Sequence, residues 1–281
     1  MKKAKLLLLA LLTATMMFGC GKKEEVSEQP VEQPEAESVI IETGNMVTSY
    51  LTGKPVDEAI GRQRPLAVMF NNIEAGCPQT GISRADVVYE CPVEGRITRL
   101  MGIIENWHDL EKIGSIRSCR DYYLSFALEF DPIYVHFGQA TVYVGDMLNS
   151  DLVDNISGAV AGIDRSATNA FYRIDERKAP HNLYASADGI MEYIEKFDYD
   201  LSYDEDFYGK FKFAADGEDL DYSAYPDATA LYPGGKERNK ANGYSKVGAY
   251  FLYNEEDGKY YPYQYGEPQI DEMTGEQLAY D

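Results

Sequence analysis

Short apolar segments alternate with helical patterns over the first two thirds of the chain, and this alternation limits the possible folds more than any other feature. The segments "PLAVMFNN" (65–72) and "IYVHF" (133–137) have the length and apolar content of buried strands. The segment "SADGIMEYIEKF" (186–197) has apolar residues at helical spacing behind a serine that can cap the helix. A further helix is expected near 140–150. The pattern predicts a mixed α/β domain over residues 51–200.

A hairpin is predicted within this domain, over "VVYECPVEGRITRLMGIIEN" (87–106). A two-residue turn at Glu94-Gly95 would place Glu90 opposite Arg99, so we interpret these two residues as a cross-strand ion pair. Glu90 and Glu94 are four residues apart on one strand, which separates them by roughly 13 Å. This distance is too large for the carboxylate pair of a glycosidase.

The composition changes near residue 199, because 14 of the 23 tyrosines lie from this point onward. The segment "KFKFAA" is strand-like, and "VGAYFLYNEEDGKYYPYQYG" reads as a hairpin with Asp257-Gly258 in its turn. These patterns predict a β-rich second domain over 201–281 and an α+β fold for the whole chain. The last residues, "GEPQIDEMTGEQLAYD", contain no obvious closing strand. We therefore expect this domain to be incomplete, or its edge to be covered by the first domain.

The amino terminus predicts where the protein is located. Residues 1–19, "MKKAKLLLLALLTATMMFG", combine three lysines with a short apolar run, as a signal peptide does. Gly19-Cys20 resembles the end of a bacterial lipobox, in which the cysteine is acylated, although a plain signal peptide or an N-terminal anchor would also fit. Residues 20–50 are rich in Glu, Gln, Pro and Ser, so we expect a disordered tether. The prediction is a lipoprotein anchored in the lipid bilayer through Cys20, on the extracytoplasmic face of the cell membrane.

The net charge of the chain is −21, and removal of the three lysines of the leader would change it to −24. A body with this charge is repelled at long range by nucleic acids and by anionic membrane surfaces. We therefore expect no nucleic-acid partner. Any site for an anion must be a local basic pocket.

One candidate for such a pocket lies in "KIGSIRSCRDYYL". Ser118 to Asp121 fit the capping-box pattern, so Arg117 and Arg120 should lie at the beginning of a helix, where unpaired N–H groups favour anions. His136 lies at the carboxyl end of the following strand, an edge where open α/β sheets often bind ligands. The alternative is that both arginines form ion pairs with nearby acidic residues.

A second candidate is the loop "RKAPHNLYAS" (177–186), which presents Lys178, His181 and Asn182. Acid–base chemistry by an imidazole would depend mainly on His136 or His181. The alternative is a loop histidine hydrogen-bonded to the backbone.

The cysteines give no metal-binding pattern. After acylation of Cys20, an odd number remains, namely Cys77, Cys91 and Cys119. No spacing typical of zinc ligands is present, and no motif for another cofactor is found. We predict buried free thiols, with a Cys77–Cys91 disulfide as the alternative.

Several stretches together resemble the YerB-like lipoproteins, a bacterial envelope family whose two domains have no known function. They include "LTGKPVDEAIGRQRPLAVMFNN", "QTGISRADVVYECPVEGRITRLMGI", "KIGSIRSCRDYYL", "DPIYVHFG" and "RKAPHNLYAS". The resemblance implies an N-terminal α/β-type domain, a β-rich second domain and a lipid anchor, but no established reaction. The positions carried over as candidate ligand-binding residues are Arg117, Ser118, Arg120, His136, Lys178, His181 and Asn182.

These observations lead to one main hypothesis and two alternatives. The main hypothesis is a membrane-anchored envelope lipoprotein that binds an anionic ligand, such as a wall glycan or a phosphate-bearing polymer. The first alternative is a hydrolase or transferase of wall or glycan metabolism that uses His136 or His181 as general acid or base. The second is a structural or protein-docking component of the envelope.

Overall fold

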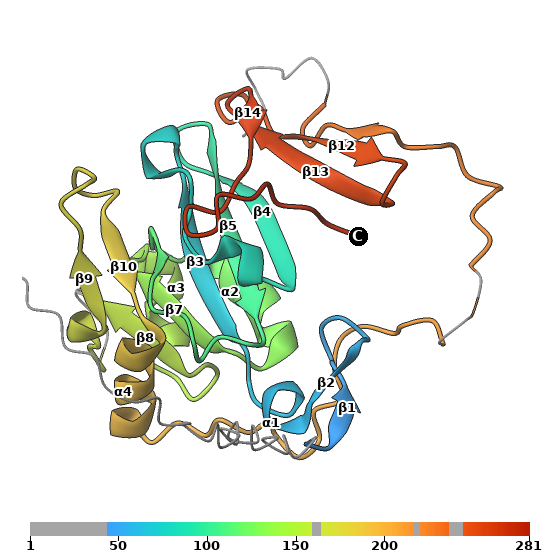
Figure 1. Ribbon diagram of the computed structural model, residues 1–281. Coiled ribbons are helices and arrows are strands. Elements are labelled where there is room, and N and C mark those ends of the chain that lie inside the picture. Colours follow the sequence, from blue (N-terminus) through green and yellow to red (C-terminus); the bar gives the residue numbers. More distant parts are fainter. Residues whose placement is uncertain (1–43, 159–163, 216–217, 219, 236–243) are drawn as a thin grey trace, which may run out of the picture. The chain divides into compact units, whose positions relative to one another are not determined.

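The computed structural model describes residues 44–158, 164–215, 218, 220–235 and 244–281 (Figure 1). The expected leader, Cys20 and most of the expected tether lie outside these residues. Over the described ranges, no helix has the length and apolar character needed to cross a membrane.

A five-stranded mixed sheet forms the centre of the fold. Its strands, in spatial order, are β4 (Val87–Val93), β5 (Ile97–Ile104), β3 (Leu66–Asn72), β7 (Ile133–Phe137) and β8 (Asn155–Gly158). The first three are antiparallel neighbours, whereas β3, β7 and β8 run parallel to one another. The strands predicted at 65–72 and 133–137 are therefore confirmed.

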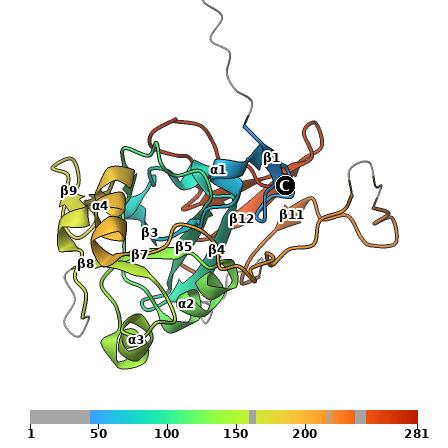
Figure 2. The ribbon, with the colours of Figure 1, turned by 90° about the horizontal axis from the view of Figure 1, so that it is seen from below.

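Both faces of this sheet are covered, which explains the nearly continuous apolar sequence of β3. Leu66, Val68 and Phe70 belong to one core, to which α4 (Ala187–Phe197) contributes. Ala67 and Met69 belong to the other core, with residues of α2 (Asp121–Ala127) and α3 (Thr141–Leu148). Figure 2 shows α2 and α3 on one side of the sheet and α4 on the other.

The helix predicted over 186–197 is confirmed as α4. The Ser186 hydroxyl caps it by accepting a hydrogen bond from Gly189 N at 3.1 Å. Ile190 and Ile194 are buried against the sheet. The helix expected near 140–150 is α3.

The capping box predicted at Ser118 is wrong, because α2 begins only at Asp121 and has no side-chain cap. The preceding residues are extended and pair with the sheet. Arg117 N donates to Met69 O at 2.9 Å, and Cys119 N donates to Gly138 O at 2.9 Å. These backbone bonds hold the segment out of the helical conformation until residue 121.

The hairpin of β4 and β5 is confirmed, but its predicted register is wrong by one residue. Val93 pairs with Ile97, so the turn has three residues, and Arg96 at its end has a left-handed φ of 61°. Glu90 therefore lies opposite Leu100, and Arg99 lies opposite Cys91. Because a slip of one residue moves a side chain to the other face of the sheet, the predicted Glu90–Arg99 ion pair does not form.

Short elements complete the first two hundred residues. They are a two-stranded sheet of β1 (Met46–Thr48) and β2 (Pro55–Asp57), the helix α1 (Glu58–Gly61), and a three-stranded sheet of β6 (Ile113–Gly114), β10 (Leu183–Ala185) and β9 (Phe171–Arg173). Single 3-10 turns occur at Glu74–Gly76, Ile82–Arg84, Leu128–Phe130 and Thr168–Ala170.

The remaining residues form an antiparallel sheet, which completes the predicted α+β fold. Its strands are β11 (Ala230–Leu231), β12 (Tyr250–Asn254), β13 (Lys259–Gln264) and β14 (Glu267–Pro268). The hairpin of β12 and β13 is confirmed, with Asp257 and Gly258 in its turn. The segment "KFKFAA" forms no strand. The boundary between two domains near residue 200 stays a prediction.

The last residues, expected to lack a closing strand, pair with β13 and also contact the first part of the fold. Tyr280 exchanges two backbone hydrogen bonds with Tyr260, at 2.8 and 2.9 Å. Leu278 is buried in the core that contains Ile82. Asp271 is fully buried and accepts two hydrogen bonds from Ser83, both of 2.9 Å.

Candidate functional site

The predicted anion site lies at the carboxyl end of the parallel strands. Its backbone is fixed by the same bonds that delay the start of α2. Arg117 N donates to Met69 O of β3, and Phe137 N of β7 donates to Arg117 O at 3.1 Å. Arg117 is therefore placed across the ends of two parallel strands, at the edge where sheets of this kind commonly bind ligands.

Arg117 is half-buried and has no acidic partner among the described residues. Its Nη1 donates to the carbonyl of Pro180 at 3.2 Å. Burial lowers the pKa of its guanidinium, and the nearby positive charges of Arg120 and Arg173 lower it further. The side chain therefore lies in a locally positive environment.

Arg99 adds a second arginine that forms no ion pair in the described part of the chain, while the charge of Glu94 acts on it from a longer distance. It projects from β5, is only 7% exposed, and donates through Nη1 to Ser118 O. Burial lowers the pKa of Arg99 to about 10, assisted by the charges of Arg120 and Arg117. Sequence reasoning missed this residue because the incorrect hairpin register paired it with Glu90.

Arg173 is the third arginine in this region, and it is hydrogen-bonded to Asn182. Its Nη1 donates to Asn182 Oδ1 at 2.8 Å, and its guanidinium lies 5.9 Å from the ring centroid of Phe137. Asn182 Nδ2 donates to Ile174 O at 2.8 Å. We call Arg99, Arg117 and Arg173 the arginine cluster.

Arg120 lies beside the cluster but is neutralised. Its Nε and Nη2 donate to the two carboxylate oxygens of Glu94, at 2.8 and 2.7 Å. The bond with Arg120 lowers the pKa of Glu94 to about 2. For Arg120 the alternative of an internal ion pair therefore holds, and its partner comes from the β4–β5 turn.

His136 does not reach the surface. The side chain is fully buried, its Nδ1 donates to Gly138 O at 3.0 Å, and Nε2 lies 2.6 Å from Ser157 Oγ. Burial lowers the pKa of His136 to about 4, so the imidazole is neutral at physiological pH. Both ring nitrogens are engaged inside the protein, which contradicts a role in holding an external ligand in this conformation.

Of the loop residues, His181 lies near the arginine cluster, whereas Lys178 points into solvent. His181 Nδ1 accepts from Asn71 Nδ2 at 3.0 Å, which leaves the proton on Nε2. Burial and the charges of Arg117 and Arg177 lower its pKa. Lys178 is exposed. The structure thus brings together Arg117, Arg120, His181 and Asn182 and leaves out His136 and Lys178; Ser118 takes part through its backbone carbonyl.

Chemistry by metals or thiols finds no support in the described residues. No group of three His, Cys, Asp or Glu side chains in these ranges is placed to hold a metal ion. Cys77, Cys91 and Cys119 are free thiols as predicted, but only Cys119 is buried, whereas Cys77 and Cys91 are half-buried. Burial raises the pKa of Cys119 to about 12, so this thiol is not activated as a nucleophile.

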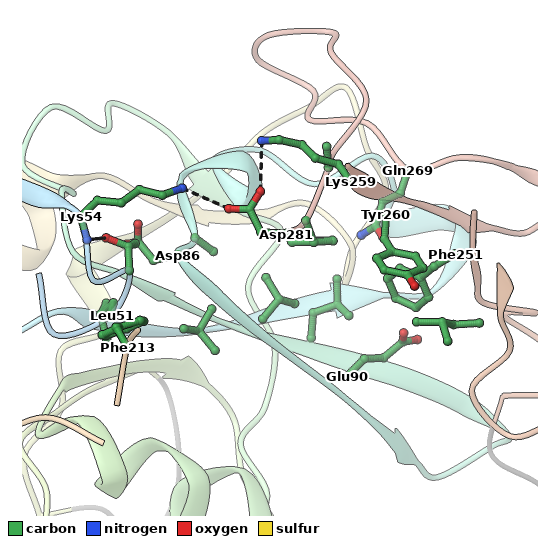
Figure 3. A pocket seen from close by; sticks show the side chains of 18 residues that line it. Leu51, Lys54, Asp86, Glu90, Phe213, Phe251, Lys259, Tyr260, Gln269 and Asp281 are labelled. Carbon is green, nitrogen blue, oxygen red and sulfur yellow. Dashed lines mark hydrogen bonds and ion pairs between the residues drawn. The ribbon is translucent and has the colours of Figure 1, made fainter. Parts of the chain in front are cut away.

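A cleft of about 560 Å³ lies elsewhere, and sequence reasoning did not anticipate it (Figure 3). Residues of β4, β5, β12 and β13 line it together with the last residues of the chain. Glu90 lies in this cleft, on the opposite face of the β4–β5 hairpin from Arg99. Burial raises the pKa of Glu90 to about 7.

Comparisons with known proteins identify the family. Residues 51–200 match the family described as "Protein of unknown function (DUF3048) N-terminal domain". The chain is 35% identical over 160 residues to the "Putative lipoprotein YerB" of Bacillus subtilis (strain 168), which covers 57% of this chain and 46% of that protein. The chain thus spans about half the length of this curated relative.

The fold agrees with this assignment. The crystal structure of YerB protein from Bacillus subtilis matches with a TM-score of 0.65 and 27% identity, covering 83% of this chain and 72% of that one. The chain therefore belongs to the DUF3048 family of proteins of unknown function and is a YerB-like protein.

Proposed function

We propose that this protein is an envelope lipoprotein that binds an anionic ligand through the arginine cluster. The leader that ends in Gly19-Cys20 and the similarity to a relative named as a putative lipoprotein support an acylated Cys20. This lipid would hold the protein on the extracytoplasmic face of the cell membrane, with the tether between the bilayer and the folded residues.

The observation that carries the proposal is the lack of acidic partners for Arg99 and Arg117 in the described ranges. A buried charge without a counter-charge is unfavourable, so folded proteins normally pair it. Here the buried Arg99 and the half-buried Arg117 instead lie beside the exposed Arg173, within a chain of net charge −21. An oxyanion from solution would supply the missing counter-charge.

The donors favour a phosphate or a carboxylate. Guanidinium groups bind both bidentately and stay charged at every physiological pH. His181 can add a neutral donor, because its Nδ1 accepts from Asn71 and its proton is therefore on Nε2. In the envelope, phosphate-bearing polymers and acidic wall glycans are ligands of this chemistry.

The test is a calorimetric titration of the purified full chain with glycerol phosphate at constant ionic strength. We expect Arg117→Gln to weaken binding at least about tenfold, because it removes a charge-assisted hydrogen bond. Arg120→Gln should change the affinity less than about threefold, since Glu94 already neutralises Arg120.

Arg84→Gln is the matched control, because Arg84 is paired with Asp109 away from the site, at 3.0 and 3.1 Å. This variant should bind glycerol phosphate like the wild type. Equal affinities of the wild type and Arg117→Gln would refute the proposal.

A further inference from the structure

The cleft that contains Glu90 has the features of a second binding site, independent of the arginine cluster. Its volume of about 560 Å³ is within the range of small-molecule sites. Its walls are largely apolar and aromatic, with contributions from Leu51, Val88, Leu100, Phe213, Phe251 and Tyr260. Figure 3 shows Glu90 below the rings of Phe251 and Tyr260.

Glu90 has hydrogen-bond donors but no cation. Thr98 Oγ1 donates to its carboxylate at 2.6 Å, and Asn72 Nδ2 lies 3.4 Å from the same oxygen. No lysine or arginine of the described residues forms an ion pair with it. The cleft therefore holds an acidic group whose counter-charge is missing.

The two lysines of the cleft share the single side-chain carboxylate of Asp281. Lys54 Nζ lies 3.1 Å and Lys259 Nζ 3.5 Å from the carboxylate of Asp281 (Figure 3). Asp86 and Glu90 also line the cleft, so its three carboxylates exceed its two lysines by one negative charge. A cationic ligand would complement it.

Gln269 supplies a donor that also lacks a partner. This side chain is only 8% exposed and lines the cleft, and its Nε2 has no hydrogen-bond partner among the residues that the structure describes. A buried donor that stays unpaired is unfavourable and is therefore rare in folded proteins. A carbonyl oxygen of a ligand would satisfy it.

We propose that this cleft binds a small apolar primary amine that carries a neighbouring carbonyl group, of the class of apolar amino-acid amides. The ammonium group pairs with Glu90, the carbonyl accepts from Gln269 Nε2, and the apolar side chain packs against Phe251 and Tyr260. The aromatic walls also favour a cation near their faces.

The experiment is calorimetry of the full chain at pH 7 with L-phenylalaninamide and with its N-acetyl derivative, which lacks the charge. We expect the amine to bind at least about tenfold more tightly than the acetylated compound. Glu90→Gln should weaken binding of the amine about tenfold, whereas Glu192→Gln, on the exposed side of α4, should leave it unchanged.

Two further variants leave Glu90 in place, so they test the proposal even if Glu90→Gln alters the fold. Gln269→Leu should weaken the binding of L-phenylalaninamide. It should not weaken the binding of phenethylamine, which has no carbonyl. Leu231→Trp, at a half-exposed position on the cleft wall, should fill the cleft and weaken binding while Glu90 stays intact. The proposal is overturned if no saturable binding of the amine is found, if acetylation has no effect, or if Glu90→Gln or Leu231→Trp binds like the wild type.

Discussion

The two ends of the parallel strands carry arginines in opposite electrostatic situations. At the amino end, Arg64 precedes β3 and contacts Asp131 before β7 and Asp154 before β8, at 3.2 and 2.6 Å. At the carboxyl end, Arg117 and Arg99 have no acidic partner in the described residues. The fold thus pairs Arg64 with two aspartates, whereas Arg117 and Arg99 form no ion pair within the described residues. Under our proposal, the charge at the carboxyl end is matched by a ligand and not by the protein.

The largest expected effect is on stability at the amino end. Arg64→Leu should lower the free energy of unfolding by about 3 kcal/mol, because it breaks a buried ion pair and leaves two aspartates without their partner. Arg117→Leu should change it by less than about 1 kcal/mol, since that variant also removes the repulsion by Arg120 and Arg173. Urea unfolding followed by circular dichroism measures both. Equal losses would show that the two ends do not differ.

His136 provides a test at the carboxyl end that depends on pH. Its pKa is about 4 in the folded protein against an ordinary value of 6.5, so the unfolded chain binds the extra proton first. The stability that this group contributes is complete above pH 6.5 and is lost as the pH falls toward 4, by up to about 3 kcal/mol. His136→Asn should remove this loss from the unfolding free energies measured between pH 4 and 7. If the unfolding free energy of His136→Asn depended on pH in the same way as that of the wild type, the burial of His136 would be contradicted.

Glu90 should show the opposite sign. Its pKa is raised from 4.5 to about 7, so the folded protein holds the proton more tightly than the unfolded chain. Stability from this group is complete below pH 4.5 and decreases as the pH rises toward 7, by about 1 to 3 kcal/mol. Glu90→Gln should abolish this decrease in urea unfolding at a series of pH values. A parallel decrease in both proteins would mean that Glu90 already has a cationic partner.

The smallest expected effect is on ligand affinity and concerns the ion pair of Arg120 with Glu94. Glu94→Gln would free Arg120 and add a fourth positive charge to the arginine cluster. We expect glycerol phosphate to bind about threefold more tightly, a modest gain because the Glu94 side chain is 71% exposed and its ion pair is screened. Calorimetry against Glu111→Gln as control measures this change. Unchanged or weaker binding would separate Arg120 from the ligand.

Much of the fold could be predicted because its signals are local. The apolar run of β3 and the capped, amphipathic α4 depend only on neighbouring residues. The start of α2 could not be predicted, since it is delayed by backbone bonds from Arg117 and Cys119 to distant strands.

The site was predicted only in part, for a related reason. The number of residues in the β4–β5 turn decides whether Arg99 lies opposite Glu90 or on the face of the arginine cluster. The same turn also places Glu94 within hydrogen-bond distance of Arg120. Burial of His136 depends on β8 and on the packing of two layers, neither of which is visible around residue 136.

The most direct test of the unmatched charge is a crystal structure of the full chain with selenate, a tetrahedral anion whose selenium can be located by anomalous scattering. We predict a selenium peak at the carboxyl end of β3 and β7, with oxygens about 3 Å from the guanidinium of Arg117, and its loss in Arg117→Gln. A carboxylate of the chain paired with Arg117, or a peak that persists in the variant, would contradict the account.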